Sequence, residues 1–148
     1  MRHLCDSNVL VALTVEAHSA HDAALAWLRT LVVGDTLGFC RMSEMSFLRL
    51  LTQKIAEGYK PLKNEEAVEK LKHWKALAFV EVCSEPLSME SDWLRRAAIG
   101  QPAPKRWMDA YLAVFAIRAG MRLVTLDGDF EKFKTDGLDL LVLRAQGA

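Results

Sequence analysis

The sequence predicts an α/β protein in which a parallel sheet lies between two layers of helices. Short apolar runs alternate along the chain with helical segments, and this alternation is typical of successive βαβ units. We find no internal repeat, low-complexity tract or linker, and 148 residues fit one ordinary domain. A single domain is therefore expected over residues 1–148, with a three-layer, Rossmann-like α/β/α architecture.

Five short apolar runs are expected to form the strands of this sheet. The first run ends at an acid, and the segment Asn8–Leu13 that follows it is expected to form a turn. Cys5, Cys40 and Cys83 all fall within expected strands. The strands are expected at Arg2–Cys5, Leu37–Arg41, Phe79–Cys83, Met121–Leu126 and Leu140–Leu143.

Start and stop signals place the helices between these strands. Ser19 and Ser43 are expected to cap helix N-termini, and Glu65 and Glu66 suit the first turn of a helix expected to begin at Asn64. Glycines follow the other helices and are expected to end them. The remaining helices are expected at about Ser19–Val33, Ser43–Gly58, Met89–Ile99 and Trp107–Ala119.

Composition narrows the functional classes. The chain carries 19 acidic and 19 basic side chains, which argues against non-specific coating of nucleic acid, because that binding depends on phosphate neutralisation. No apolar run is long enough for a membrane span, and the residues after Met1 leave no room for a signal core, so a cytoplasmic location and no membrane partner are expected. The three cysteines have no metal-ligand spacing and are expected to be buried, reduced thiols.

Four acidic residues border or lie inside apolar segments rather than on charged faces. They are Asp6, Glu44, Asp109 and Asp127. Carboxylates are rarely buried without a partner, and four of them brought together would repel one another unless a hard cation held them. Mg²⁺ or Mn²⁺ with oxygen ligands fits that requirement, which points to metal-dependent phosphodiester chemistry.

The positions of these acids predict that they meet. Asp6 and Asp127 each follow an expected strand, and sites in open parallel sheets form beyond the carboxyl ends of the strands. Glu44 shares a helix face with apolar residues such as Leu48. Asp109 lies in the first turn of its helix, where the dipole favours an acid, so a structural role at the helix start remains an alternative.

Polar neighbours are expected to support the acids. Asn8 can orient a carboxylate or form an Asx turn, and Thr125 and Ser7 can donate to the carboxylates or satisfy the backbone. Asp129 lies two residues after Asp127, where it can be a metal ligand, an outer support or a turn residue.

Four segments together give the chain a resemblance to PIN domains, and within them to the VapC-type toxins of toxin–antitoxin systems. The segments are DSNVLVAL, SEMSFLRLLT, PAPKRWMDAYLAVFAIRAG and LVTLDGDF, and the resemblance also includes His18, His21, Ala24 and Trp27–Leu28. The resemblance covers nearly the whole chain. The order of the four acids in their strand and helix contexts is more specific than any one segment.

The resemblance implies an endoribonuclease that needs Mg²⁺ or Mn²⁺, frequently forms a homodimer and is inhibited by a cognate antitoxin. It places the catalytic and metal-binding centre at Asp6, Glu44, Asp109 and Asp127. The fourth acid is the least uniform in this family, so the choice between Asp127 and Asp129 stays open. The expected chemistry is attack of water on an RNA phosphodiester, with Asp6 and Asp109 as direct ligands.

Basic residues near the acids are candidates for RNA contacts. Lys105 and Arg106 lie in a Pro-containing loop just before Asp109, and Arg41 and Arg49 flank Glu44. Trp107 can stack on a base, although core packing at the helix start is the stronger expectation.

Three other interpretations remain. A haloacid-dehalogenase-like phosphatase also places an Asp after its first strand, but it needs a second Asp at the position of Asn8. A non-catalytic PIN-like module that binds RNA or a protein partner would need none of the acids to act. His18 and His21 are spaced as a metal pair can be, although helix-entry packing explains them as well.

Overall fold

The computed structural model describes residues 1–145 and contains a five-stranded sheet whose neighbouring strands are all parallel. The strand order is β3-β2-β1-β4-β5, so β1 lies at the centre. This confirms the predicted sheet. The strands are β1 (Arg2–Cys5), β2 (Thr36–Phe39), β3 (Val80–Val82), β4 (Arg122–Thr125) and β5 (Leu140–Val142).

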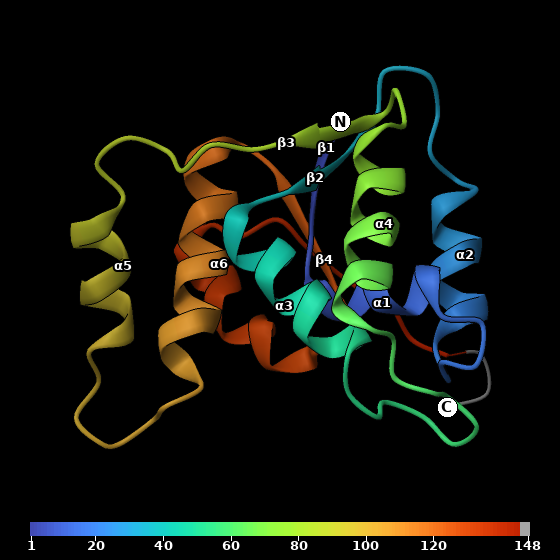
Figure 1. The fold of residues 1–148 in the computed structure, drawn as a ribbon. Coiled ribbons are helices and arrows are strands. Elements are labelled where there is room, and N and C mark those ends of the chain that lie inside the picture. Colours follow the sequence, from blue (N-terminus) through green and yellow to red (C-terminus); the bar gives the residue numbers. More distant parts are fainter. Residues whose placement is uncertain (146–148) are drawn as a thin grey trace.

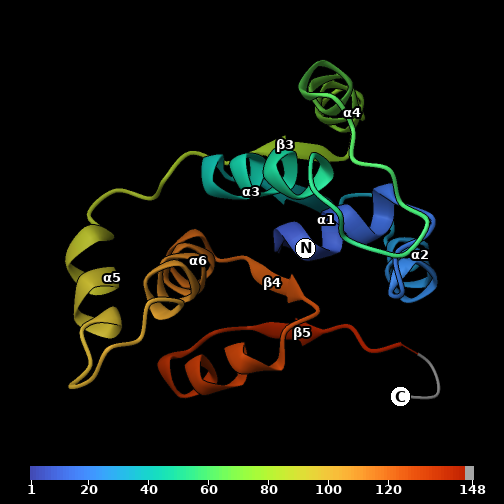
Figure 2. The same cartoon turned by 60° about the horizontal axis from the view of Figure 1, so that its bottom comes forward.

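Six α-helices and one 3₁₀ segment connect the strands. Figure 1 shows α5 and α6 on one side of the central strands and α1, α2 and α4 on the other. Figure 2 gives the same division from below, with α6 beside β4. The bounds are α1 (Ser7–Thr14), α2 (His21–Leu28), α3 (Arg41–Leu51), α4 (Asn64–Lys75), α5 (Glu90–Ala97), α6 (Arg106–Ala119) and the 3₁₀ segment η1 (Gly128–Asp136).

Alternate residues of the central strands enter two separate cores. Leu4 and Leu123 pack in the core that α6 covers, whereas the next residues, Cys5 and Val124, pack in the core formed with α1, α2 and α3. This period of two follows from the pleat of a strand. Both faces of the sheet are therefore covered, as parallel sheets require.

The expected turn at Asn8–Leu13 is wrong, because these residues belong to helix α1. Asp6 caps the helix with an extended backbone, and its carbonyl oxygen accepts from the amides of Val9 and Leu10. The segment Val9–Leu13 is buried throughout. Burial of this continuous apolar run against the sheet stabilises the short helix. The helix was not predicted because its sequence has no amphipathic pattern.

The boundaries of two further helices differ from the prediction. Helix α2 begins at His21 instead of Ser19 and ends at Leu28 instead of Val33, and α3 begins at Arg41 with Cys40 as its N-cap. Ser43 lies inside the first turn of α3, where its hydroxyl accepts from the Cys40 amide at 2.9 Å. Helix α3 ends at Leu51, well before Gly58, and at this end the Thr52 hydroxyl donates to the carbonyls of Leu48 and Arg49.

Two glycines occupy positions where a side chain would be unfavourable. Gly120 ends α6 with φ +66°, a left-handed conformation that disfavours other residues. Gly38 of β2 lies so close to Met121 and Cys83 that a Cβ atom there would come within 2.7 Å of the Met121 side chain.

Cys5, Cys40 and Cys83 are buried and free, which confirms the expectation for the thiols. Within residues 1–145, no helix combines the length and apolar character needed to cross a bilayer.

Candidate active site at the carboxyl ends of the strands

Asp6 is fixed at the junction of β1 and α1, beside the end of β4. Its amide donates to the Val124 carbonyl at 2.9 Å, and its Oδ2 accepts from the Thr125 hydroxyl at 2.7 Å. The same hydroxyl oxygen accepts from the amide of Asp127 at 3.0 Å. Thr125 therefore links two of the predicted acids. Burial raises the pKa of Asp6 although the Thr125 hydrogen bond opposes the shift.

Asp109 brings a third carboxylate to this place from the first turn of α6. It is 9% exposed, and no group among residues 1–145 donates a hydrogen bond to its buried Oδ2. Burial raises the pKa of Asp109; the Lys105 charge opposes this shift, and the charges of Asp127 and Asp6 add to it. A buried carboxylate oxygen without a donor is costly, so this atom calls for a cation.

The acids surround a cavity of about 250 Å³. Asp6, Asp109 and Asp127 line it together with Arg49 and Lys105. Helix α3 also contributes the small polar residues Ser43 and Ser46, and Met108, Leu112 and Phe130 add apolar surface. The structure thus brings three of the four predicted acids to one cavity at the predicted edge of the sheet.

Lys105 supplies the positive charge nearest to these acids. Its Nζ lies 2.5 Å from Asp127 Oδ2, 3.1 Å from Asp129 Oδ2 and 3.9 Å from Asp109 Oδ2. The hydrogen bond to Asp127 holds the pKa of the Lys105 ammonium well above its usual range. Burial alone would raise the pKa of Asp127, but the donors from Lys105 and the Asp129 amide bring it below its usual value.

Glu44 is placed differently from the other three acids. It is 2% exposed and does not line the cavity. Its Oε2 accepts from Arg41 at 2.8 Å, and the Lys75 ammonium of α4 lies 2.7 Å from Oε1 but outside hydrogen-bond geometry. In this arrangement Glu44 connects α3 to α4, and its role as a metal ligand stays a prediction.

The auxiliary residues take several roles. Asn8 accepts from the Leu126 amide at 3.3 Å and so ties α1 to the end of β4. Asp129 donates its amide to Asp127 Oδ1 and is exposed, which places its carboxylate at the rim. Ser7 lies 3.5 Å from Asp6 Oδ1, the long limit of a hydrogen bond.

As the side chains lie, no three His, Cys, Asp or Glu residues within 1–145 form a group that could hold a metal ion. The donor set still fits Mg²⁺ or Mn²⁺, because carboxylate oxygens are their preferred protein ligands. The unpartnered Oδ2 of Asp109 gives the same indication.

The basic residues predicted to contact RNA separate into two groups. Arg41 pairs with Glu44, and Arg106 donates to the Arg96 carbonyl while its guanidinium lies over the Phe133 ring. Lys105 and Arg49 line the acidic cavity instead.

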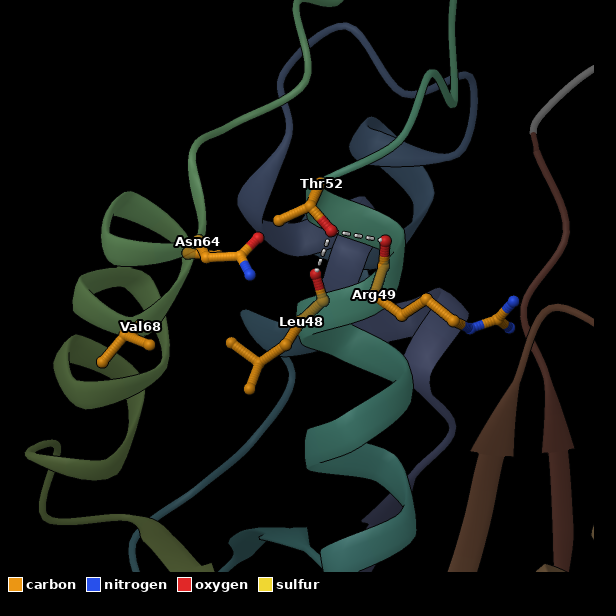
Figure 3. Close-up of a pocket in the computed structure, with 6 residues that line it drawn as sticks. Leu48, Arg49, Thr52, Asn64 and Val68 are labelled. Atoms are coloured by element: carbon orange, nitrogen blue, oxygen red, sulfur yellow. Dashed lines mark hydrogen bonds between the residues drawn. The ribbon is translucent and has the colours of Figure 1, made fainter.

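Arg49 lies between the acidic cavity and a second pocket. Figure 3 shows that second pocket between α3 and α4, with Leu48, Thr52, Asn64 and Val68 around it. The Arg49 guanidinium points away from those residues. Within the described part of the chain we find no ion pair for Arg49, so its charge is available at the acidic cavity.

Burial and contacts test the roles expected for Trp107 and for the two histidines His18 and His21. Trp107 is 48% exposed, so core packing does not explain it. His18 Nδ1 accepts from the Ala20 amide, and His21 Nδ1 lies 2.7 Å from the Ala12 carbonyl. Both histidines thus make local contacts at the entry of α2, as their packing role predicts.

Sequence reasoning missed Asp92, a buried acid on α5. Its Oδ1 accepts from Arg95 and Arg96, and Arg118 of α6 lies 3.5 Å from Oδ2. Burial opposes ionisation, yet these arginines hold the pKa of Asp92 below its usual value. Its i+3 and i+4 arginines were the only signal in the sequence. Asp109 differs from Asp92, because the Lys105 ammonium lies 3.9 Å from its Oδ2 and is shared with Asp127 and Asp129.

The chain is similar to known proteins over most of its length. A family model described as PIN domain matches residues 4–135. Ribonuclease VapC41 of Mycobacterium tuberculosis is 40% identical over 150 residues, covering 95% of this chain and 97% of the relative. Ribonuclease VapC37 of the same organism is 31% identical, covering 88% and 91%.

The fold also resembles a solved structure. VapBC2 from Rickettsia felis, bound to a DNA fragment from its promoter, aligns with a TM-score of 0.67 over 97% of this chain and 100% of that chain. The sequence identity is 18%, so this likeness concerns the fold.

Proposed function

The chain belongs to the PIN domain family, and from that premise we propose that it is a metal-dependent endoribonuclease, the toxin of a toxin–antitoxin pair. The relatives that align with this chain over nearly their full length are named ribonucleases of the VapC type. The substrate of the proposed reaction is RNA, and the reaction is hydrolysis of a phosphodiester bond at the cavity around Asp6, Asp109 and Asp127.

One observation carries this proposal: the Asp109 carboxylate is buried, its Oδ2 accepts no hydrogen bond from residues 1–145, and two further carboxylates lie beside it. A structural acid in the same fold, Asp92, is surrounded by arginines. The acids at the cavity are short of positive charge, and Mg²⁺ or Mn²⁺ would supply it.

The side chains have distinct proposed tasks. Asp6 and Asp109 would hold the cation directly, Asp127 would complete the site, and Asp129 would support it from the rim. A bound divalent cation lowers the pKa of a coordinated water and offsets charge on the phosphate oxygens. Thr125 keeps the Asp6 carboxylate and the Asp127 amide in fixed positions. Arg49 can bind a phosphate oxygen without first losing an ion pair.

Glu44 remains in the proposed acidic set on the strength of the family resemblance. To act as a ligand it would have to exchange its contacts with Arg41 and Lys75 for the cation. Trp107, exposed at the start of α6, is proposed to stack on an RNA base.

The partners follow from the same proposal. We propose a cognate antitoxin, as the resemblance to VapC-type toxins implies, together with a homodimeric assembly and a cytoplasmic location. The phosphatase alternative is not favoured, because it needs an acid at the position of Asn8, whose amide cannot act as one.

Cleavage of RNA is expected to require a divalent cation. Purified protein incubated with RNA should cleave it in Mg²⁺ or Mn²⁺, stop in excess EDTA and resume when Mn²⁺ is restored. Denaturing gel electrophoresis of the RNA measures the result. Cleavage at an undiminished rate in EDTA would overturn the metal mechanism. Absence of cleavage with every cation and RNA tested would favour the non-catalytic binding module.

An antitoxin encoded beside this chain is expected to form a tight complex and neutralise its toxicity. A basic antitoxin side chain is expected to reach Asp6 or Asp109, because those acids lack sufficient positive charge. Co-expression should rescue growth, and size-exclusion chromatography should show one complex. A pair that elutes separately and leaves growth arrested would contradict the expectation.

A further inference from the structure

We propose that Lys105 is a tethered cation that occupies the acidic cavity in the metal-free protein, yields its place to a divalent cation, and then contacts the RNA phosphate. This inference rests on the proposed function, because it concerns the cation and substrate of the same cavity. It gives Lys105 a second role besides a phosphate contact, which is to compete with the divalent cation for the carboxylates.

The contacts of Lys105 are those of a counter-ion shared among acids. One ammonium lies within 4 Å of carboxylate oxygens from Asp109, Asp127 and Asp129. Two of these acids come from the segment after β4 and the third from α6. A single side chain thus joins the two segments across the cavity, as a bound cation would.

The charge around Lys105 is unbalanced. The Lys105 ammonium lies among three carboxylates, and Asp6 and Arg49 add one charge of each sign to the same cavity. A divalent cation brings twice the charge and can contact the oxygens more closely than an ammonium can. Such a cation therefore competes well for the same oxygens, and Lys105 must leave when it binds.

Lys105 is able to leave. Lys105 is the residue just before α6, and its side chain is 61% exposed. Packing therefore does not hold the ammonium in the cavity. Its flexible four-carbon stem lets the ammonium move while the backbone stays in place. Once displaced, the ammonium joins Arg49 beside the cavity, where a phosphate of the substrate would need positive charge.

The consequence is a coupling between metal and substrate. RNA that draws Lys105 toward a phosphate removes the competitor of the metal, and metal that expels Lys105 frees it for the phosphate. By linkage, each ligand strengthens the binding of the other.

Lys132 offers a matched control for the charge itself. Its charge also acts on Asp109 and Asp127, yet its ammonium lies over the Phe133 ring at 5.4 Å. Lys132→Gln removes the same charge from the neighbourhood of the acids as Lys105→Gln does. It removes none of the ion pairs that Lys105 makes.

The test is titration of metal-free protein with Mn²⁺ by isothermal calorimetry, without RNA. Lys105→Gln should bind Mn²⁺ at least about tenfold more tightly than the unaltered chain, because a direct competitor is gone. Lys132→Gln should stay within about threefold, since a distant exposed charge is screened. Lys105→Arg retains the cation and should bind Mn²⁺ no more tightly than the unaltered chain.

A melting experiment provides a second readout, in which the loss of a merely structural lysine would give a deficit that Mn²⁺ does not remove. In EDTA, Lys105→Gln should melt below the unaltered chain, because the acids lose their counter-ion, and saturating Mn²⁺ should remove the difference. A deficit that persists equally in Mn²⁺ would overturn the inference.

The calorimetric outcomes separate this inference from the proposed function. Equal Mn²⁺ affinity in the Lys105→Gln and Lys132→Gln variants, or weaker binding in Lys105→Gln, would overturn the role of Lys105 while leaving the metal site intact. Failure of the unaltered chain and all variants to bind Mn²⁺ would overturn both.

Discussion

Asp6→Asn and Asp109→Asn are each expected to abolish RNA cleavage while the protein stays folded. Each substitution removes the charge of a proposed direct ligand and keeps its shape, so the fold loses little. Removing a residue that only supports a metal ligand already costs about 10–100-fold, and loss of a ligand should cost more. Initial rates of RNA cleavage at saturating Mn²⁺, with circular dichroism as the check on folding, measure the effect.

Asp139→Asn is the matched control for these variants. Asp139 is exposed and, within residues 1–145, forms an ion pair only with Arg122 at 3.0 Å, so its neutralisation should leave the rate unchanged. If Asp6→Asn or Asp109→Asn cleaved RNA as fast as Asp139→Asn, the acidic cavity would not be the active site.

Glu44→Gln distinguishes two roles for the fourth acid. As a metal ligand, Glu44 should be required for cleavage, and its loss should weaken Mn²⁺ binding. As a connection between α3 and α4, its loss leaves Lys75 without its carboxylate, so stability should fall while Mn²⁺ affinity stays the same. The structure shows the second set of contacts, and the family resemblance predicts the first role.

Much of the fold follows from local signals. The apolar runs predicted every strand to within a residue or two, and Gly120 predicted the end of α6. Helix α1 was missed because it is apolar almost all round and buried, so it has no periodicity to show. The end of α3 was missed because a Thr52 hydroxyl, instead of a glycine, accompanies the helix end.

The candidate site was predictable where chain topology dictates it. Asp6 and Asp127 follow adjacent parallel strands, so their convergence was implied once β1 and β4 were neighbours. The neighbourhood of Glu44 was not predictable, because Lys75 lies on a separate helix and only tertiary packing brings them together. The pairing of Lys105 with three acids likewise depends on how the loop before α6 folds back over the cavity.

Asp109→Asn is expected to leave the metal-free protein as stable as before or more stable by about 1 kcal/mol at neutral pH. The pKa of Asp109 is raised in the folded protein by burial and by neighbouring acids, so its stabilising contribution belongs to low pH. That contribution is lost as the pH rises through the raised pKa. The asparagine variant has no carboxyl group to ionise, and its stability should therefore fall less between mildly acidic and neutral pH.

Metal should reverse the ranking of the two proteins. Mn²⁺ at a hundredfold excess over its dissociation constant stabilises the unaltered chain by about 2.7 kcal/mol through mass action, and the variant by much less. An acid that served only the start of α6 would behave in the opposite way, because losing a helix-terminal interaction costs about 1 kcal/mol in any buffer. Denaturant or thermal unfolding of both proteins, in EDTA and in Mn²⁺, measures all four stabilities. A variant that is less stable in EDTA and gains as much from Mn²⁺ as the unaltered chain would show that Asp109 is structural.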